Sequence, residues 1–157
     1  MTTPEENKEI VRRYYEEAFN EGRIELLDEL VAEDVVNYDP LSDETLTPEE
    51  ARGFDGFVRH VEVAREAFPD ATVTIEEMIA EDDSVCVRFT FEGTHEGRFV
   101  GIEPTGKRVN GTNMVLMHIE DGKIAERWEE SDNLEFLQQL GVVPSVEELM
   151  LTAAAID

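Results

Sequence analysis

The sequence is poor in cysteine and in basic residues. Its single cysteine, Cys86, cannot form a disulfide within the chain and excludes a multi-cysteine metal site. Thirteen Lys and Arg residues stand against 38 Asp and Glu residues, which gives a formal net charge of -25 at pH 7. Phosphate backbones and anionic membranes are repelled by such a surface, so we expect no nucleic-acid partner and no membrane partner.

Long apolar runs are also absent. The chain starts with the polar stretch MTTPEENKE, and no stretch resembles a signal sequence or a membrane-spanning helix. We therefore expect a cytoplasmic protein. Lysine is scarce while carboxylates are abundant, a pattern typical of proteins dissolved in concentrated salt, where ions screen the self-repulsion. The composition thus predicts an acidic, halophilic protein.

What the sequence does contain is enough apolar material for one core. It has 157 residues, 41% of them hydrophobic, and we expect one domain, residues 1–157. Apolar residues recur at helical spacing in 3–19, 23–30 and 54–68, and the period changes to two after Pro69. Helices followed by a strand meander predict an α+β fold with helices on one face of an antiparallel sheet. A short strand at 35–37, a surface loop at 41–53, a strand at 97–101, a helix at 134–140 and a C-terminal helical tail within 143–157 complete the prediction.

The stretch MHIEDGKIAERWEESD, residues 117–132, is the most informative part of the strand region. A two-residue turn here would require positive φ at both Asp121 and Gly122, whereas a three-residue turn requires it only at the glycine. We therefore favour the three-residue turn. It places His118 opposite Ile124 and on one face with Trp128 and Asp132.

Asp132 is the best candidate for acid/base chemistry in this stretch. A carboxylate on a concave apolar face beside an indole has its charged form disfavoured, which would raise its pKa toward neutrality. The alternative is a helix N-cap, since Asp132 stands two residues before Leu134. His118 has a similar alternative as a core-edge histidine. From the residues alone, both structural alternatives are favoured.

A set of short segments occurs in a fixed order along the chain. They are AFPD at 67–70, GTHEG at 93–97, PTGK at 104–107, DGKI at 121–124, W-x-x-x-D at 128–132 and QLG at 139–141. In this combination residues 8–141 resemble the SnoaL-like polyketide cyclases and predicted ester cyclases, of the nuclear-transport-factor-2-like superfamily. The resemblance implies a cone-shaped, curved antiparallel sheet whose concave pocket is covered by the N-terminal helices. It also implies a homodimer or higher homo-oligomer, a small-molecule substrate, and catalysis without a cofactor or metal.

The resemblance further implies roles for individual residues. Asp132 would exchange protons with a small apolar carbonyl substrate during an intramolecular aldol-type ring closure, while His118 would polarise the enolate oxygen. Asn37 resembles a polar pocket position, although it is equally well explained as a turn-former before YDP. Further candidates for substrate binding are Trp128, Tyr15 and Phe57. We expect His60 to face solvent, and the resemblance gives His95 no chemical role.

Two other functions remain open from the sequence. The same fold supports isomerases and dehydratases, which also need a carboxylate in an apolar pocket. It also supports non-catalytic modules that only bind a ligand, and in that case Asp132 would be a helix cap alone. The enzyme hypotheses require Asp132 and His118 to point into one enclosed, mainly apolar cavity.

Overall fold

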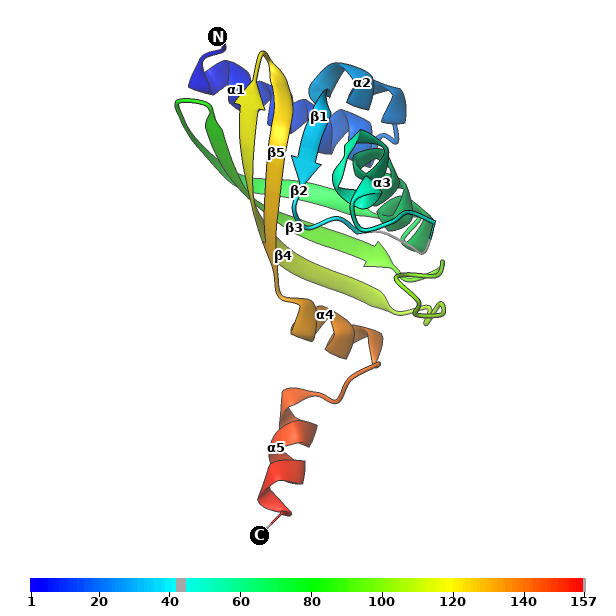
Figure 1. Cartoon of the computed structure of the whole chain (residues 1–157). Helices are drawn as coiled ribbons and strands as arrows, with labels where there is room; N and C mark the ends of the chain where they lie inside the picture. Colours follow the sequence, from blue (N-terminus) through cyan, green and yellow to red (C-terminus); the bar gives the residue numbers. More distant parts are fainter. Residues whose placement is uncertain (42–44, 157) are drawn as a thin grey trace.

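The molecule consists of a curved, unclosed five-stranded sheet with helices packed against one face (Figure 1). The computed structural model describes residues 1–41 and 45–156. The strand order is β1-β5-β4-β3-β2, and the strands are β1 (Val31–Asn37), β2 (Thr72–Glu81), β3 (Ser84–Thr94), β4 (Arg108–Glu120) and β5 (Lys123–Ser131). The α+β class is confirmed.

The sheet is mixed, whereas an antiparallel sheet was predicted. Strands β2 to β5 form the predicted antiparallel meander, but β1 lies parallel to β5. The chain reaches β1 from the helical layer, so no hairpin forces β1 to run against its neighbour. As a result β5 has a hydrogen-bonded strand on each side.

The helical layer comes from two parts of the chain. Its elements are α1 (Pro4–Arg13), η1 (Tyr14–Asn20), η2 (Ile24–Leu26), α2 (Leu27–Leu30), η3 (Glu50–Arg52) and α3 (Phe54–Ala67). Helix α1 begins with a capping box between Thr3 and Glu6. The predicted first helix therefore exists, but its second half, η1, is π-helical. Such wide turns are rare and are often found at functional sites. Here the turn carries Tyr14 and Tyr15, both of which are buried.

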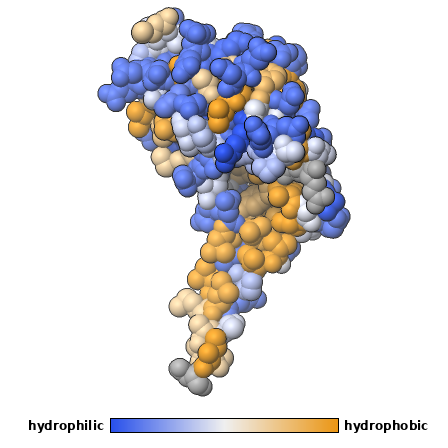
Figure 2. All heavy atoms as spheres, in the orientation of Figure 1, coloured by the Kyte–Doolittle hydropathy of each residue, from blue (hydrophilic) through white to orange (hydrophobic). Residues whose placement is uncertain are grey.

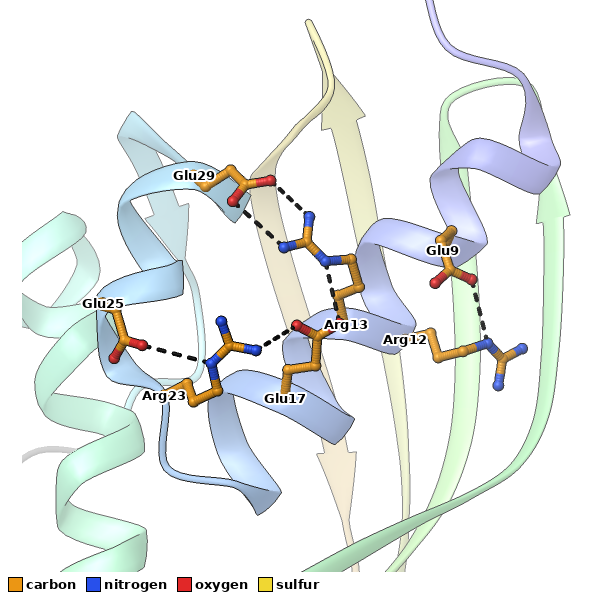
Figure 3. Close-up of polar contacts among 7 residues, drawn as sticks. All are labelled: Glu9, Arg12, Arg13, Glu17, Arg23, Glu25 and Glu29. Carbon is orange, nitrogen blue, oxygen red and sulfur yellow. Dashed lines mark hydrogen bonds and ion pairs between the residues drawn. The ribbon is translucent and has the colours of Figure 1, made fainter.

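Ion pairs between surface arginines and glutamates connect the first helices to one another (Figure 3). Arg13 contacts Glu29 of α2 at 2.6 Å and Glu17 of η1 at 3.3 Å. Arg23 then joins Glu17, at 3.1 Å, to Glu25, at 3.6 Å. The scarce arginines in this region are thus used as bridges between carboxylates, which reduces the local repulsion. Exposed pairs of this kind contribute little individually, about 0–1 kcal/mol.

The hairpin between β4 and β5 differs from the prediction. Glu120 pairs with Lys123 and Ile119 with Ile124, so the turn has two residues, Asp121 and Gly122, with φ of 49° and 76°. The register then shifts by one residue, because His118 pairs with Glu126. The intervening Ala125 forms a bulge. The predicted three-residue turn and the pairing of His118 with Ile124 are therefore wrong.

Two smaller segments also depart from the sequence prediction. The expected strand at 97–101 is a tight turn with one bridge, between Phe99 and Ile102. In this turn Val100 has φ of 45° and Gly101 has φ of 84°. Within the expected loop 41–53, residues 42–44 lie outside the described residues, and Glu50–Arg52 forms a single helical turn.

The C-terminal part forms two helices, α4 (Asn133–Leu140) and α5 (Val146–Ala154). Gly141 ends α4 with φ of 76°, as a left-handed C-cap. Helix α5, the predicted tail, extends away from the body, and hydrophobic side chains gather over α4 and α5 (Figures 1 and 2). Among the described segments, none forms a helix with the length and apolar character needed to cross a bilayer.

Candidate active site

A cavity of about 620 Å³ lies between the sheet and the helical layer. Its apolar wall is rich in phenylalanine, with Phe19, Phe68, Phe89, Phe91, Phe99 and Phe136. Several of these rings contact one another edge to face, for example Phe68 and Phe91 with centroids 5.4 Å apart. The wall is therefore a rigid aromatic surface suited to a flat apolar molecule.

The polar part of the cavity is centred on strand β5. Arg127 is only 1% exposed and donates through Nη2 to the Glu129 carboxylate. Glu129 also accepts a hydrogen bond from the Ser131 hydroxyl at 3.0 Å. These residues alternate along β5, so all three lie on the face of the sheet that the helices cover. An ion pair thus lies inside a mainly apolar cavity.

The electrostatics of this centre favour a permanently charged guanidinium. Burial alone would lower the pKa of Arg127, but Glu129, Tyr14 and Tyr15 outweigh burial, and its pKa is raised. Burial also raises the pKa of Tyr14 to about 12 and that of Tyr15 well above its ordinary value. Both tyrosines are therefore neutral hydroxyls near neutral pH. The centre contains one cation, one carboxylate and two phenols.

Several buried polar groups at this centre have hydrogen-bonding atoms that no protein group satisfies. Arg127 Nη1 donates to Asn37 Oδ1 at 3.2 Å. Across residues 1–41 and 45–156, Tyr15 Oη, Asn37 Nδ2 and Arg127 Nε have no hydrogen-bond partner although they are buried. Buried polar atoms without a partner are uncommon in proteins and call for an explanation such as water or a ligand. The surplus consists mainly of donors, which suits an oxygen-bearing ligand.

The segment after β1 forms one wall of the cavity. Asp39 Oδ2 accepts the backbone N–H of Glu129 at 2.9 Å, and the backbone N–H of Leu41 donates to His60 Nδ1 at 2.8 Å. Asp39, Leu41 and His60 all line the cavity. These two bonds hold residues 39–41 between β5 and α3. His60 is 6% exposed, so the prediction that it faces solvent is wrong.

Asp132 lies at the rim of this cavity. Its Oδ1 accepts the backbone N–H of Glu135 at 2.9 Å, which makes it the N-cap of α4, and its side chain is exposed. The structural alternative given by the sequence, a helix cap, is confirmed. Asp132 nevertheless lines the cavity together with Asn133 and Glu135. It is a solvated carboxylate at the entrance and not the shielded one that was expected.

His118 and Trp128 lie on the opposite side of the sheet from the cavity. The His118 ring contacts Trp128 with centroids 4.9 Å apart and binds Glu126 Oε2 through Nδ1 at 2.9 Å. Trp128 in turn stacks on Tyr38 at 4.8 Å. The expectation that His118 and Trp128 share a cavity with Asp132 is wrong. The two residues do share one face of the sheet, as predicted, but the helices cover the other face, on which the apolar side chains Val115, Met117 and Ile119 of β4 are buried.

The remaining predicted residues lie at or near the cavity. Tyr15 lines it, and Asn37 lies beside it, bonded to Arg127. Phe57 is fully buried and packs on Tyr14 with centroids 5.5 Å apart, so it supports the cavity from the core and does not line it. His95 is buried near Phe68, with Nδ1 accepting from the Thr105 backbone at 3.2 Å.

Sequence reasoning missed Arg127, Glu129 and His60. Arg127 and Glu129 flank Trp128 in a run of charged residues. The bulge at Ala125 determines that these two side chains, and not that of Trp128, point inward. A buried arginine leaves no periodic signal in such a run. His60 shares a helix face with the buried Phe57 and Ala64, and this spacing could have revealed it. Among the described residues, no group of three or more His, Cys, Asp or Glu side chains is placed to hold a metal ion.

A concave cavity with an aromatic wall and a charged floor, built on an α+β fold, defines a small-molecule site. Comparison with known proteins specifies it further. The SnoaL-like polyketide cyclase model matches residues 9–140. The nogalonic acid methyl ester cyclase of Streptomyces nogalater is 33% identical over 126 residues, covering 79% of this chain and 90% of that protein. The aklanonic acid methyl ester cyclase DnrD of Streptomyces peucetius is 31% identical over 135 residues, covering 85% and 89%.

Solved structures agree with the sequence relatives. IdmH, a candidate polyketide cyclase from Streptomyces antibioticus, superimposes with a TM-score of 0.73 at 34% identity and covers 86% of this chain and 98% of that one. The chain therefore belongs to the SnoaL-like polyketide cyclase family and is an enzyme of the cyclase type.

Proposed function

We propose that this protein closes a ring in a flat, aromatic polyketide ester by an intramolecular aldol-type reaction. The observation that carries the proposal is the pairing of an aromatic wall with a shielded Arg127–Glu129 centre in one cavity. The names of the nogalonic and aklanonic acid methyl ester cyclases identify them as enzymes that cyclise methyl esters, and the matching family model is one of polyketide cyclases. A cavity of about 620 Å³ is within the range that holds a compact polycyclic molecule.

In this proposal Glu129 is the base that removes a proton from the carbon that forms the new bond. Of the cavity-lining carboxylates in the described part of the chain, Glu129 is the one that is not exposed, with 18% of its side chain accessible. Arg127 and Ser131 hold it in one orientation, as a base acting on a weak carbon acid requires. The same proton then returns to the alkoxide that ring closure creates.

Arg127 and its neighbours would stabilise the negative charge that develops on the enolate oxygen. A guanidinium in a cavity with little water acts on such a charge much more strongly than it would in bulk solvent. The unpartnered Tyr15 hydroxyl and Asn37 amide add donors next to it. Asp132, at the rim, is the second candidate for the acid/base, and His118 has no path to the cavity because it lies across the sheet.

The proposal is tested with aklanonic acid methyl ester and nogalonic acid methyl ester as substrates. Aldol closure isomerises the substrate, so liquid chromatography should resolve a new species of unchanged mass that contains one ketone fewer. Absence of such a species with both esters at high enzyme concentration would reject the proposed reaction class. Loss of water from the product would instead indicate a dehydratase.

We also propose that the protein is a homodimer that pairs through the outer face of the sheet. Ile79, Met114 and Leu116 on this face are 64%, 50% and 39% exposed, and Leu116 lies directly opposite Trp128. A row of exposed apolar residues is unusual in a chain of which 32% is charged. Sedimentation of the Leu116→Glu variant tests this: it should be monomeric, and an unchanged dimer would reject the interface.

A further inference from the structure

His60 occupies a position in the cavity that the mechanism above does not use. It lies in the middle of α3, comes from the helical layer and lines the cavity, whereas Glu129 lines the same cavity from the sheet. The two side chains therefore reach the cavity from different walls. Phe57 packs near the imidazole, with ring centroids 6.4 Å apart.

The hydrogen bond to Leu41 fixes the tautomer of His60. A backbone N–H can only donate, so Nδ1, at 2.8 Å from Leu41 N, must be the acceptor. Neutral histidine then carries its proton on Nε2. Within residues 1–41 and 45–156, the hydrogen bond from Leu41 is the one that the His60 ring makes, so Nε2–H is not engaged by a protein acceptor. The bond to Leu41 leaves Nε2 as the nitrogen that can serve a ligand.

The surroundings of His60 keep the ring neutral. Burial lowers its pKa well below the ordinary value of 6.5, and the positive charge of Arg127 lowers it further. Asp39 also faces this part of the cavity, but its Oδ2 accepts the Glu129 backbone N–H. A neutral imidazole N–H is a poor acid but a good hydrogen-bond donor. Such a group can stabilise an oxyanion without giving up its proton.

We propose that the Nε2–H of His60 donates a hydrogen bond to the carbonyl oxygen that is attacked during ring closure. This inference rests on the proposed aldol-type function. Glu129 takes the proton from the nucleophilic carbon, and that carbon forms a bond to the carbonyl carbon. The π electrons of the carbonyl move to its oxygen, where His60 stabilises them. The oxygen then receives the proton from Glu129, so atoms and charge balance without another reactant.

An alternative role for His60 is purely structural, as the anchor of the Leu41 segment. Two isosteric substitutions separate these roles. The side-chain oxygen of His60→Asn can replace Nδ1 as the acceptor for Leu41 N–H, but this side chain is too short to supply a donor at Nε2. The amide nitrogen of His60→Gln can reach the Nε2 position and supply that donor.

The test compares steady-state turnover of aklanonic acid methyl ester by the wild type and both variants. If His60 contacts the substrate, His60→Asn loses about 100-fold in kcat with KM nearly unchanged, and His60→Gln retains most of the activity. The reverse order, or equal activity in all three proteins, would overturn the assignment to His60. A wild-type protein that fails to turn over either ester rejects the proposed function itself, which is a separate outcome.

A measurement that does not depend on turnover completes the test. The chain has three histidines, so nitrogen–proton correlation NMR of the full-length protein resolves each imidazole, and the His60 variants assign its signals. We expect His60 in the Nε2–H form, with its Nε2 resonance shifting when aklanonic acid methyl ester binds. A proton on Nδ1, or an Nε2 resonance that does not move at saturating ester, would reject the contact.

Discussion

Arg127 donates a hydrogen bond to Glu129, two residues further along β5, and both side chains lie on the cavity face of the sheet. This pair combines two functions that a ring-closing enzyme needs. The carboxylate can move a proton, and the guanidinium can stabilise the negative charge that results. Neither residue could do this on the solvated side of the sheet, where water would weaken both effects.

The first prediction separates the two candidate bases. Glu129→Gln keeps the shape of the side chain but cannot accept a proton, so we expect kcat to fall by at least about 100-fold. Asp132→Asn should remain within about threefold of the wild type, because asparagine is also a good N-cap for α4. Turnover assays on both esters measure this. A severe loss in Asp132→Asn with an active Glu129→Gln would move the acid/base role to the rim.

The second prediction concerns the stability of the ion pair. Arg127→Met should lower the free energy of unfolding by about 3 kcal/mol, because it leaves Glu129 and Asn37 without their partner. Glu129→Leu should also destabilise the fold. The double variant should lose less than the sum of the two, since no unpaired charge remains. Urea unfolding of the four proteins gives the coupling energy, and strict additivity would contradict the pairing.

The third prediction concerns pH. Folding keeps His60 neutral, because burial and Arg127 lower its pKa below 6.5, the value near which it titrates in the unfolded chain. As pH falls below that value, the unfolded state binds a proton that the folded state does not, so the stability contributed by His60 is lost. The stability advantage of the wild type over His60→Gln should therefore shrink by up to about 1.4 kcal/mol per pH unit. Urea unfolding at constant ionic strength measures it, and a constant difference would contradict burial of the ring.

The fourth prediction concerns the turn at Val100. A β-branched residue with φ of 45° is strained, and Asn-Gly is the preferred pair for two-residue turns in which both residues have positive φ. Val100→Asn should raise the free energy of unfolding by about 1 kcal/mol. Val142→Asn is the matched control, since Val142 is also exposed but has no positive φ. Equal effects in the two variants would show that polarity, and not strain, is responsible.

The fifth prediction concerns salt. With a net charge of -25, repulsion should destabilise the fold at low ionic strength. Raising KCl from about 0.1 M to about 2 M should increase the free energy of unfolding, because the Debye length falls from about 10 Å to under 3 Å. Stability that does not change over this range would contradict the halophilic character that the composition predicts.

The sequence predicted the parts of the fold that depend on local periodicity. The helix ending at Ala67, the β2–β5 meander and the α4 helix ended by Gly141 all follow from spacing and turn residues. The parallel pairing of β1 was not predictable, because the direction of β1 depends on where α2 ends relative to the sheet. The same holds for the bulge at Ala125, which no residue preference marks.

The candidate site was predicted only in part. Tyr15 lines the cavity, and Asn37 lies beside it, bonded to Arg127. The resemblance to the family suggested Asn37, although the residues alone explained it equally well as a turn-former. The prediction put His118 and Trp128 on one face of the sheet, and the observed register, which differs from the predicted one by two residues, keeps them together. The prediction wrongly took that face for the cavity face and so overlooked Arg127 and Glu129, which point to the other side.

The bulge at Ala125 sets the faces of β5, because Ile124 and Arg127 both point inward on either side of it. Deleting Ala125 would leave these faces as they are, since the ladder already pairs Ile119 with Ile124 and His118 with Glu126. If Ala125 were instead paired in an unbroken ladder, Leu116 would lie opposite Arg127, and the guanidinium would move to the outer side of the sheet. A relative that keeps this residue but lacks the bulge would retain the overall architecture and present a chamber with an indole in place of the guanidinium, able to hold a guest but not to transform it.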